Sequence, residues 1–463
     1  MIKQNPQYIE MLPIWQKCRI AVMGDDWIKK SALLKTIVPP LSDQPDDEYK
    51  AMVNRATFFN ASGRTLDGLL GMVFRKNVVA KVPTSLESVL GDITLAKDTP
   101  INIDDFCLEM LSERLTVGRV GYLIERPAGT TQGMTVAQVQ ALNLRPYVAE
   151  YRAESILDWR FDRINNAAQL VLVRLHEEVE QYEADGVTRK DNIKQERRLL
   201  LIDGVYVQQI YREEKKFGDD IVPVMNGKPL NFIPFVCDFS ITKPPILDLA
   251  NVNLSHFRTE VDREHGAHYT AIPTPMFAGF QFGDNESFRL GATGGYNTTN
   301  SDATWGFLEF EGTGLGTLKE IKEEKEKQLV ILGAKFLDSE KSGVEAEGTV
   351  KIRRSGETSV LALHAMKCSR MAKRIMEIMR DWMGITGDVE IEINTDYTEA
   401  GMSAQDILAL FQVMQGGGIS QQTFFYNMKH GEMYDEETTF EIEQERINAQ
   451  SIGTLPAPTI QQN

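Results

Sequence analysis

Two long segments of helical character enclose a turn-rich insert, and this arrangement constrains the fold of the chain most. The first segment spans 245–269, the insert spans 270–314 and the second segment spans 315–338. At about 1.5 Å per residue each helix would be roughly 35 Å long, close to the diameter of a small domain. In residues 317–327, TLKEIKEEKEK, only one leucine and one isoleucine are large and apolar. Such a polar helix does not fit the core of a monomer, so we expect copies of this hairpin to pack together in a ring or bundle.

The size and composition of the chain are those of an ordinary globular protein. Its 463 residues, 42% hydrophobic and 25% charged, suffice for two or three compact units. No apolar run approaches the ~18–20 residues of a membrane span, and the N-terminus lacks a secretory pattern, so we expect cytoplasmic synthesis and no membrane partner. The cysteines form no CxxC pair, which predicts reduced thiols at Cys18, Cys107, Cys237 and Cys368.

The net charge of −16 is concentrated near the C-terminal end. Residues 386–463 contain thirteen Asp or Glu and only two Lys or Arg. Because affinity for nucleic acid phosphates comes mainly from Lys and Arg, we do not expect this chain to hold DNA tightly. An acidic wall would still allow DNA to slide past, and simple solubility explains the same charge equally well.

The first half of the chain changes from a helical to a strand-like pattern. Residues 1–140 are mainly helical, and a helix is expected over 103–116. Within 46–75 a helical stretch holds Tyr49, Met52, Val53, Phe58 and Phe59, and the pattern then repeats at Leu66, Leu69 and Leu70. From 145 to 240 the apolar residues alternate with polar ones, and turn residues occur at 164–167 and 184–186. The sequence therefore predicts an α+β fold, mainly helical, with a small antiparallel sheet or barrel.

The second half contains a further long helix and an acidic strand. After a polar loop at 339–355, a helix is predicted over 357–383 with one apolar seam. The seam residues are Leu361, His364, Cys368, Met371, Ile375, Ile378 and Trp382. A strand follows at 388–396, then helices that end in a segment of disordered composition.

The acidic strand is the best candidate for catalytic chemistry. Period-two geometry places five oxygen-bearing side chains on one face, namely Asp388, Glu390, Glu392, Asn394 and Asp396. A metal-dependent nuclease needs clustered carboxylates, and this hypothesis depends on Glu390 and Glu392. The apolar residues between them favour instead a half-buried strand with a solvated face. We found no phosphate loop, no zinc motif among the histidines and no catalytic triad signature, so we expect no enzymatic activity, metal or cofactor.

Four stretches of the chain resemble the portal proteins of tailed bacteriophages, which are head-to-tail connectors. They are DDEYKAMVNRATFFNASGRTLDGLLGMVFRK (46–76), YRAESILDWR (151–160), PPILDLANVNLSHFRTEVDREHGAHYTAIPTPMFAGF (244–280) and FLEFEGTGLGTLKEIKEEKEKQLVILGAKFL (307–337). The resemblance extends over most of the chain and weakens after about residue 400. It implies the portal fold, built as a ring homo-oligomer. Its parts would be a wing at 1–240 (helical at 1–140, β-rich at 145–240), a stem at 245–269 and 315–338, a clip at 270–314, a tunnel loop at 339–355, a tunnel helix at 357–385 and a crown at 386–463.

The same resemblance implies a function and a set of partners. A portal protein forms a ring, usually of twelve subunits, at one vertex of the virion capsid. Double-stranded DNA enters and leaves through its channel without sequence specificity. The partners implied are the terminase large subunit, an adaptor or head-completion protein, the major capsid protein and a scaffold protein. A metal-dependent nuclease and a channel-less minor capsid or scaffold component are the alternatives.

The resemblance also suggests roles for three groups of residues. Candidates for contact with DNA near the tunnel loop are Lys351, Arg353 and Arg354, for which helix-flanking charge at a subunit interface is the simpler interpretation. Candidates for salt bridges between neighbouring stem helices are Lys319, Glu320, Lys322, Glu323, Lys325 and Glu326. Candidates for protein contacts of the clip are Phe277, Phe280, Phe282, Tyr296 and Trp305.

Overall fold

The chain divides into two compact units, Met1–Thr395 and Asp396–Asn463. The computed structural model describes residues 3–95, 99–127, 144–183, 185–272, 274–280, 298–308, 312–337, 347–395, 397, 404–430, 433–434 and 438–451. The second unit begins ten residues after the predicted start of the acidic C-terminal region at 386. Residues 386–395 belong to the first unit, because strand β14 (Glu390–Glu392) pairs with β1 (Val79–Lys81).

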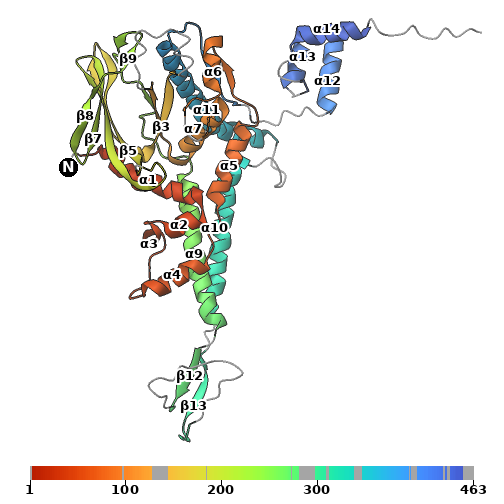
Figure 1. The fold of residues 1–463 in the computed structure, drawn as a ribbon. Coiled ribbons are helices and arrows are strands. Elements are labelled where there is room, and N and C mark those ends of the chain that lie inside the picture. The colour runs from red at the N-terminus through yellow and green to blue at the C-terminus, as the bar shows by residue number, and fades with distance from the viewer. Residues whose placement is uncertain are drawn as a thin grey trace, which may run out of the picture. The chain divides into compact units, whose positions relative to one another are not determined.

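Helices form the N-terminal part of the first unit (Figure 1). They are α1 (Pro6–Met23), α2 (Asp25–Lys30), α3 (Leu34–Ile37), α4 (Asp46–Arg55), α5 (Ala61–Val73), α6 (Glu87–Leu90) and α7 (Ile103–Val117). The prediction of a helix over 103–116 is confirmed. The helical stretch predicted within 46–75 and its repeat correspond to α4 and α5, but Phe58 and Phe59, expected in the first stretch, lie between the two helices. The Asn60 carboxamide oxygen accepts from the Gly63 amide at 2.8 Å and caps the start of α5.

A five-stranded antiparallel sheet covers the region where alternation predicted strands. Its order is β4 (Ile156–Ile164), β5 (Ala167–Tyr182), β6 (Arg189–Ile202), β7 (Val205–Arg212) and β8 (Lys215–Ile221). The predicted turn between β4 and β5 is confirmed, and Asn165 and Asn166 adopt positive φ angles of 50° and 62° there. Asparagine tolerates this left-handed backbone better than other non-glycine residues. A second sheet has the order β11 (Phe235–Cys237), β2 (Val120–Glu125), β3 (Tyr147–Arg152). Short strands β9 (Val224–Met225) and β10 (Lys228–Pro229) form a hairpin of their own.

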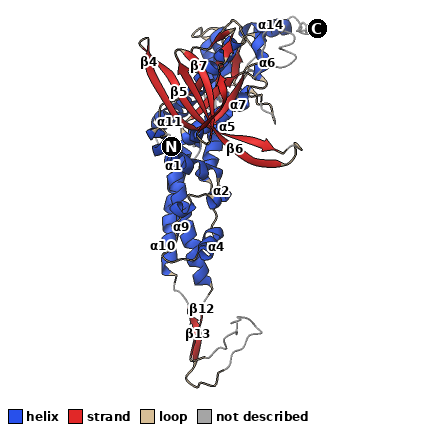
Figure 2. Cartoon of the chain, turned by 60° about the vertical axis from the view of Figure 1, so that its left-hand side comes forward, coloured by secondary structure: helices blue, strands red, loops and turns tan. Residues whose placement is uncertain are grey.

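Strands β5 and β6 extend beyond the sheet as a two-stranded ribbon. Strand β4 stops pairing with β5 at Leu175, and β7 stops pairing with β6 at Glu196. Residues 177–182 and 189–195 therefore pair only with each other, and we call them the β5–β6 ribbon. Figure 2 shows this ribbon projecting away from the sheet.

Two long helices and a small hairpin follow the sheets along the chain. Helix α9 (Leu247–Ala271) leads into β12 (Thr274–Ala278), which pairs with β13 (Thr304–Leu308), and α10 (Thr313–Leu337) returns beside α9. Both helices lie within two residues of the expected bounds. The arrangement in Figures 1 and 2 is a helical pair with a hairpin beyond its end.

Helix α11 (Glu347–Trp382) packs against α7, β2 and β11 and closes the core of the first unit. It begins ten residues before the predicted start at 357, so residues 347–355 of the predicted loop are helical. Residues 338–346 lie outside the described part of the chain. The predicted seam is confirmed, since its members are buried except for His364, which is half-buried. The Trp382 indole nitrogen donates to the Val224 carbonyl at 3.1 Å.

The second unit contains α12 (Ala404–Gln415), α13 (Gln421–His430) and α14 (Phe440–Ser451). The ring of Phe425 lies 4.8 Å from that of Tyr434 and 5.7 Å from that of Phe440. This aromatic cluster joins α13 to α14. Taken with the first unit, these helices complete a mixed fold of helices and antiparallel sheets, as predicted.

Candidate functional site

The α9–α10 pair is the candidate functional site, and its first half is anchored in the body of the unit. Helix α9 buries side chains at spacings of three and four, including Ala250, Leu254, Phe257 and Val261. Its Asn253 is fully buried, and its oxygen accepts from the Ser62 amide at 2.9 Å and the Ser62 hydroxyl at 3.0 Å. The Asn253 amide nitrogen donates to the Phe59 carbonyl at 2.7 Å. A saturated carboxamide therefore fixes α9 to the start of α5.

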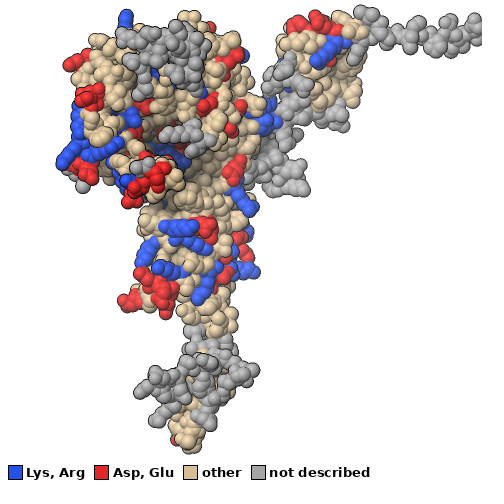
Figure 3. Space-filling model, in the orientation of Figure 1, with Lys and Arg blue, Asp and Glu red and all other residues tan. Residues whose placement is uncertain are grey.

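The rest of the pair buries few side chains. From Asp262 to Ala271 no residue of α9 is buried. Along 313–333 of α10 only Leu329 and Gly333 are buried. Exposed apolar side chains remain on α10, with Val330 64% and Ile331 55% accessible. Figure 3 shows charges of both signs side by side over this helical part.

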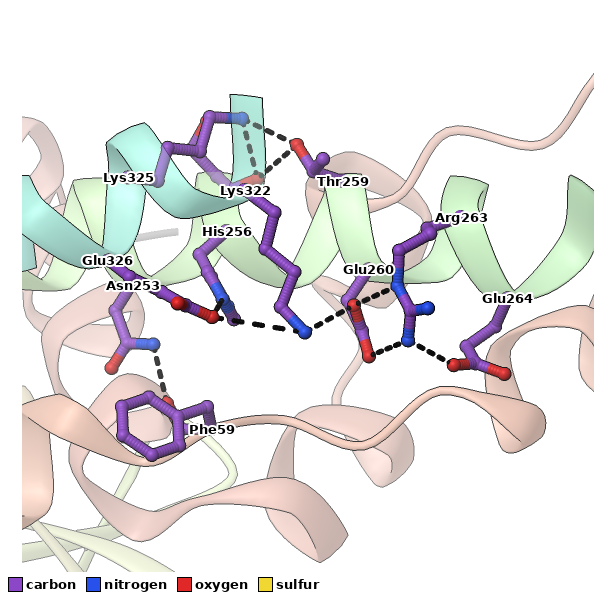
Figure 4. Close-up of polar contacts among 11 residues, drawn as sticks. Phe59, Asn253, His256, Thr259, Glu260, Arg263, Glu264, Lys322, Lys325 and Glu326 are labelled. Atoms are coloured by element: carbon purple, nitrogen blue, oxygen red, sulfur yellow. Dashed lines mark hydrogen bonds and ion pairs between the residues drawn. The ribbon is translucent and has the colours of Figure 1, made fainter. Parts of the chain in front are cut away.

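A chain of charged contacts joins the two helices (Figure 4). The Lys322 ammonium lies 2.9 Å from the Glu260 carboxylate, which also accepts two bonds of 2.9 Å from Arg263. Arg263 further contacts Glu264. The hydrogen bonds from Arg263, together with Lys322, lower the pKa of Glu260 to about 2, against the opposing effect of burial. Glu260 therefore stays ionised at every physiological pH.

A buried histidine extends this network. The Nε2 atom of His256 lies 3.3 Å from Glu326, and its ring is 6.1 Å from that of Phe59. Burial lowers the pKa of His256, although Glu326 opposes this shift. The imidazole is thus neutral near pH 7, with its proton on Nε2 to bond Glu326.

Lys325 forms the last bridge between the helices. Its ammonium donates to the Thr259 hydroxyl at 2.6 Å and to the Ser255 carbonyl at 3.1 Å (Figure 4). Burial and the nearby Arg258 lower the pKa of Lys325. Lys325 therefore bonds a backbone oxygen and a hydroxyl oxygen of α9 in the same chain.

The predicted stem residues divide into two sets. Lys322, Lys325 and Glu326 contact α9 of the same chain, as described above. Lys319 and Glu323 are exposed and lie 3.8 Å apart on α10, and Glu320 is exposed as well. Their role between subunits stays a prediction.

The residues that sequence reasoning missed are Asn253, Thr259 and Ser62. A signal for Asn253 existed, because it shares a face with His256 and Glu260 at spacings of three and seven.

The hairpin beyond the pair carries aromatic side chains. Phe277 is paired in register with Trp305, and Trp305 is 66% exposed. The Phe277 and Phe280 rings are 5.2 Å apart, and those of Trp305 and Phe307 are 5.8 Å apart. Phe282 and Tyr296 lie outside the described residues.

The remaining predicted candidates are the cations near the tunnel loop and the acidic strand. Lys351, Arg353 and Arg354 fall within α11, but their side chains lie outside the described part of the chain. In the acidic strand, Val389, Ile391 and Ile393 are buried, and Glu390 pairs with Lys81 at 2.9 Å. This is the half-buried strand that the alternation favoured. Among the described residues, no group of three or more His, Cys, Asp or Glu is placed to hold a metal ion.

Comparisons with known proteins give a family match and a distant structural likeness. A family described as "Domain of unknown function (DUF4055)" matches residues 245–383, which span α9 to α11. No curated protein matches. Two solved structures are similar at 11% identity and a TM-score of 0.37. One, "Neck of empty GTA particle computed with C6 symmetry", covers 82% of this chain and 92% of its own. The other, "Virion of native gene transfer agent (GTA) particle", covers 89% and 97%.

These likenesses are too distant to carry a functional argument, and the matched family has no assigned function. Within the described residues, no helix combines the length and apolarity that a membrane crossing requires. The function must therefore be inferred from the α9–α10 pair itself.

Proposed function

We propose that this chain is a portal protein, a non-enzymatic subunit of a dodecameric ring at one vertex of a phage-like capsid. The ring would be the channel for packaging and release of double-stranded DNA. The observation that carries the proposal is the sparsely buried α9–α10 pair, which has mixed charges, exposed Val330 and Ile331 on α10, and a hairpin at its end. Covering a valine or isoleucine side chain contributes about 1.5–3 kcal/mol when burial is complete. Neighbouring copies would supply that cover.

The sequence resemblance to portal proteins supports the same proposal. The resembling stretches include both long helices, strand β12 and the end of strand β13. The hairpin, with exposed Met276, Trp305 and Phe307, would be the surface for the terminase and the adaptor protein. The exposed lysines and glutamates of α10 would face the neighbouring stem.

The charge of the chain fits passage of DNA rather than storage. Each copy carries −16, so a ring would repel the phosphate backbone over most of its wall. Lys351, Arg353 and Arg354 would be a local exception beside the channel. DNA would then move along the wall with few sites at which to stick.

Mass photometry of the purified chain, followed by negative-stain imaging of its largest species, tests the proposal. We expect a uniform ring of about twelve subunits with a central hole. A filament or small oligomer would favour a minor capsid or scaffold component. A chain that stays monomeric, even with scaffold protein added, would refute the portal role. Divalent-ion-dependent DNA cleavage lost in Glu390→Ala/Glu392→Ala would instead establish the nuclease.

A further inference from the structure

Helix α12 of the second unit is apolar over more of its surface than one neighbouring helix can cover. At about 100° per residue, its six large apolar side chains occupy an arc of roughly 220°. A helix that packs on one surface typically has an apolar stripe of about 100°. Polar residues enter the arc of α12 only towards the two ends of the helix, as Asp406 and Gln415. The six apolar side chains are Ile407, Leu408, Leu410, Phe411, Val413 and Met414.

Within the second unit, α13 covers only part of this arc. Phe411 of α12 contacts Phe424 of α13, with ring centres 6.1 Å apart. None of the α12 side chains that the structure describes is buried, and Leu408 and Val413 are 59% and 48% exposed. These two residues lie roughly 140° apart around the helix, on opposite sides of Phe411. We call the surfaces centred on them the Leu408 flank and the Val413 flank.

The charge of the second unit limits what can cover these flanks. The unit contains ten Asp or Glu and two Lys or Arg, but residues 407–428 contain no charged residue at all. Nucleic acids and membrane surfaces are bound through Lys and Arg, which this stretch lacks. A basic protein would be attracted to the acidic remainder of the unit rather than to α12. A second copy of the same stretch brings no like charge into the contact.

The presence of two flanks fits a ring better than a dimer. In a closed ring each copy has one neighbour on either side and meets them through two different surfaces. A two-fold dimer pairs a surface with itself, so it would cover one flank and leave the other exposed. The unit also gains from such contacts, because Phe425 is the only large side chain that it buries among the residues that the structure describes.

We propose that the α12 helices of successive copies pack side by side around the ring, with the Leu408 flank of one copy on the Val413 flank of the next. The contact is apolar and the acidic residues of the unit stay outside it, in solvent. Neighbouring copies in a ring are held at a high local concentration, so a small apolar contact is sufficient to form. The inference rests on the proposed ring and names one of its contacts.

Paired substitutions test the contact from both sides. Leu408→Asp and, separately, Val413→Lys should each lower the fraction of protein in rings by about tenfold or more, because a charge is then buried against an apolar surface. The chain with both changes should recover the rings, because the new carboxylate and ammonium meet only between copies. Ile447→Asp, at an exposed apolar position of α14, should assemble normally. Circular dichroism melts of every variant check that the subunit still folds.

Disulfide trapping tests the same contact without adding charge. A chain with Leu408→Cys and Val413→Cys, oxidised after assembly, should give a ladder of covalent oligomers on a non-reducing denaturing gel. Within one helix these two side chains point in different directions and cannot bond to each other. Each single cysteine variant should give no product larger than a dimer, and the oxidised wild type should give no ladder.

Three results would overturn the inference in different ways. Rings that persist in both single charge variants and give no ladder would refute this contact, leave the portal role intact and assign α12 to a different protein. A double cysteine chain that stops at the dimer would replace the head-to-tail contact with a two-fold one. A wild-type chain that stays monomeric would refute the proposed function, and the contact with it.

Discussion

At the scale of single residues, Glu260 shows how a mostly polar helix pair is held together. It is 8% exposed and accepts from Arg263 on its own helix and Lys322 on the other. We expect Glu260→Gln to lower the free energy of unfolding by about 1–2 kcal/mol, because two partly exposed cations lose their acceptor. Glu320→Gln, at an exposed position of α10, should change it by less than about 0.5 kcal/mol. Equal losses of unfolding free energy for the two variants, measured by urea unfolding at pH 7, would contradict this account.

The same carboxylate predicts a pH dependence. Its folded-state pKa of about 2 lies below the ordinary value of 4.5, so the unfolded chain binds more protons at acid pH. The stabilisation from Glu260 is therefore complete above about pH 4.5 and is lost as the pH falls towards 2. Melting temperatures of wild type and Glu260→Gln should converge between these values.

His364 titrates in a different window. Burial, with Arg114 and Lys367 nearby, lowers its pKa to about 4. The folded imidazole stays neutral from pH 6.5 to about 4, whereas the unfolded one binds a proton, so stability falls as the pH decreases through this range. His364→Gln should flatten the curve of melting temperature against pH there. Because the side chain is only half-buried, we expect the difference to amount to about 1–2 kcal/mol. An unchanged curve would contradict the burial argument.

At the scale of elements, the β4–β5 turn depends on backbone conformation. Asn166 has a φ of 62°, which a β-branched residue adopts only with strain. Asn166→Val should destabilise the first unit by about 1–2 kcal/mol, while Asn166→Gly should be neutral or slightly stabilising. Chemical denaturation of the three chains measures this. A valine variant as stable as wild type would mean that the turn relaxes to another conformation.

Elements set by local pattern were predictable, and those set by distant contacts were not. Alternation and the Asn165–Asn166 turn indicated the antiparallel sheet, and apolar spacing indicated α7 and the seam of α11. The non-helical segment at Phe58 and Phe59 was missed, because the apolar pattern continues through it and only the capping contact of Asn60 shows where α5 begins. The bond between Asn253 and Ser62 joins residues 191 positions apart, which no local pattern encodes. The helical start of α11 at Glu347 was missed because its residues are polar.

In the candidate site too, features set by local sequence were predictable and those set by distant contacts were not. The long polar pair was visible in the sequence, and so was the likelihood of charge pairing along 319–326. The sequence does not show which of these charged side chains face α9, because each of the four lysines at 319, 322, 325 and 327 has the same alternating Lys/Glu surroundings. Only the position of α9 shows that Lys322 and Lys325 reach that helix, whereas Lys319 pairs with Glu323 along α10.

At the scale of the whole molecule, net charge predicts how an assembled ring treats DNA. Each copy adds −16, and duplex affinity comes from cations that displace counterions from phosphates. We expect fluorescence anisotropy of a labelled 30-base-pair duplex to give a Kd weaker than about 10 µM at 150 mM salt, at the weak end of non-specific binding. If Lys351, Arg353 and Arg354 are the local contacts, replacing all three with Ala reduces the slope of log affinity against log salt by up to about 3 per copy engaged. Tight binding with a steep slope that survives this triple replacement would place the DNA contacts elsewhere on the chain and would remove the argument that an acidic wall lets DNA pass.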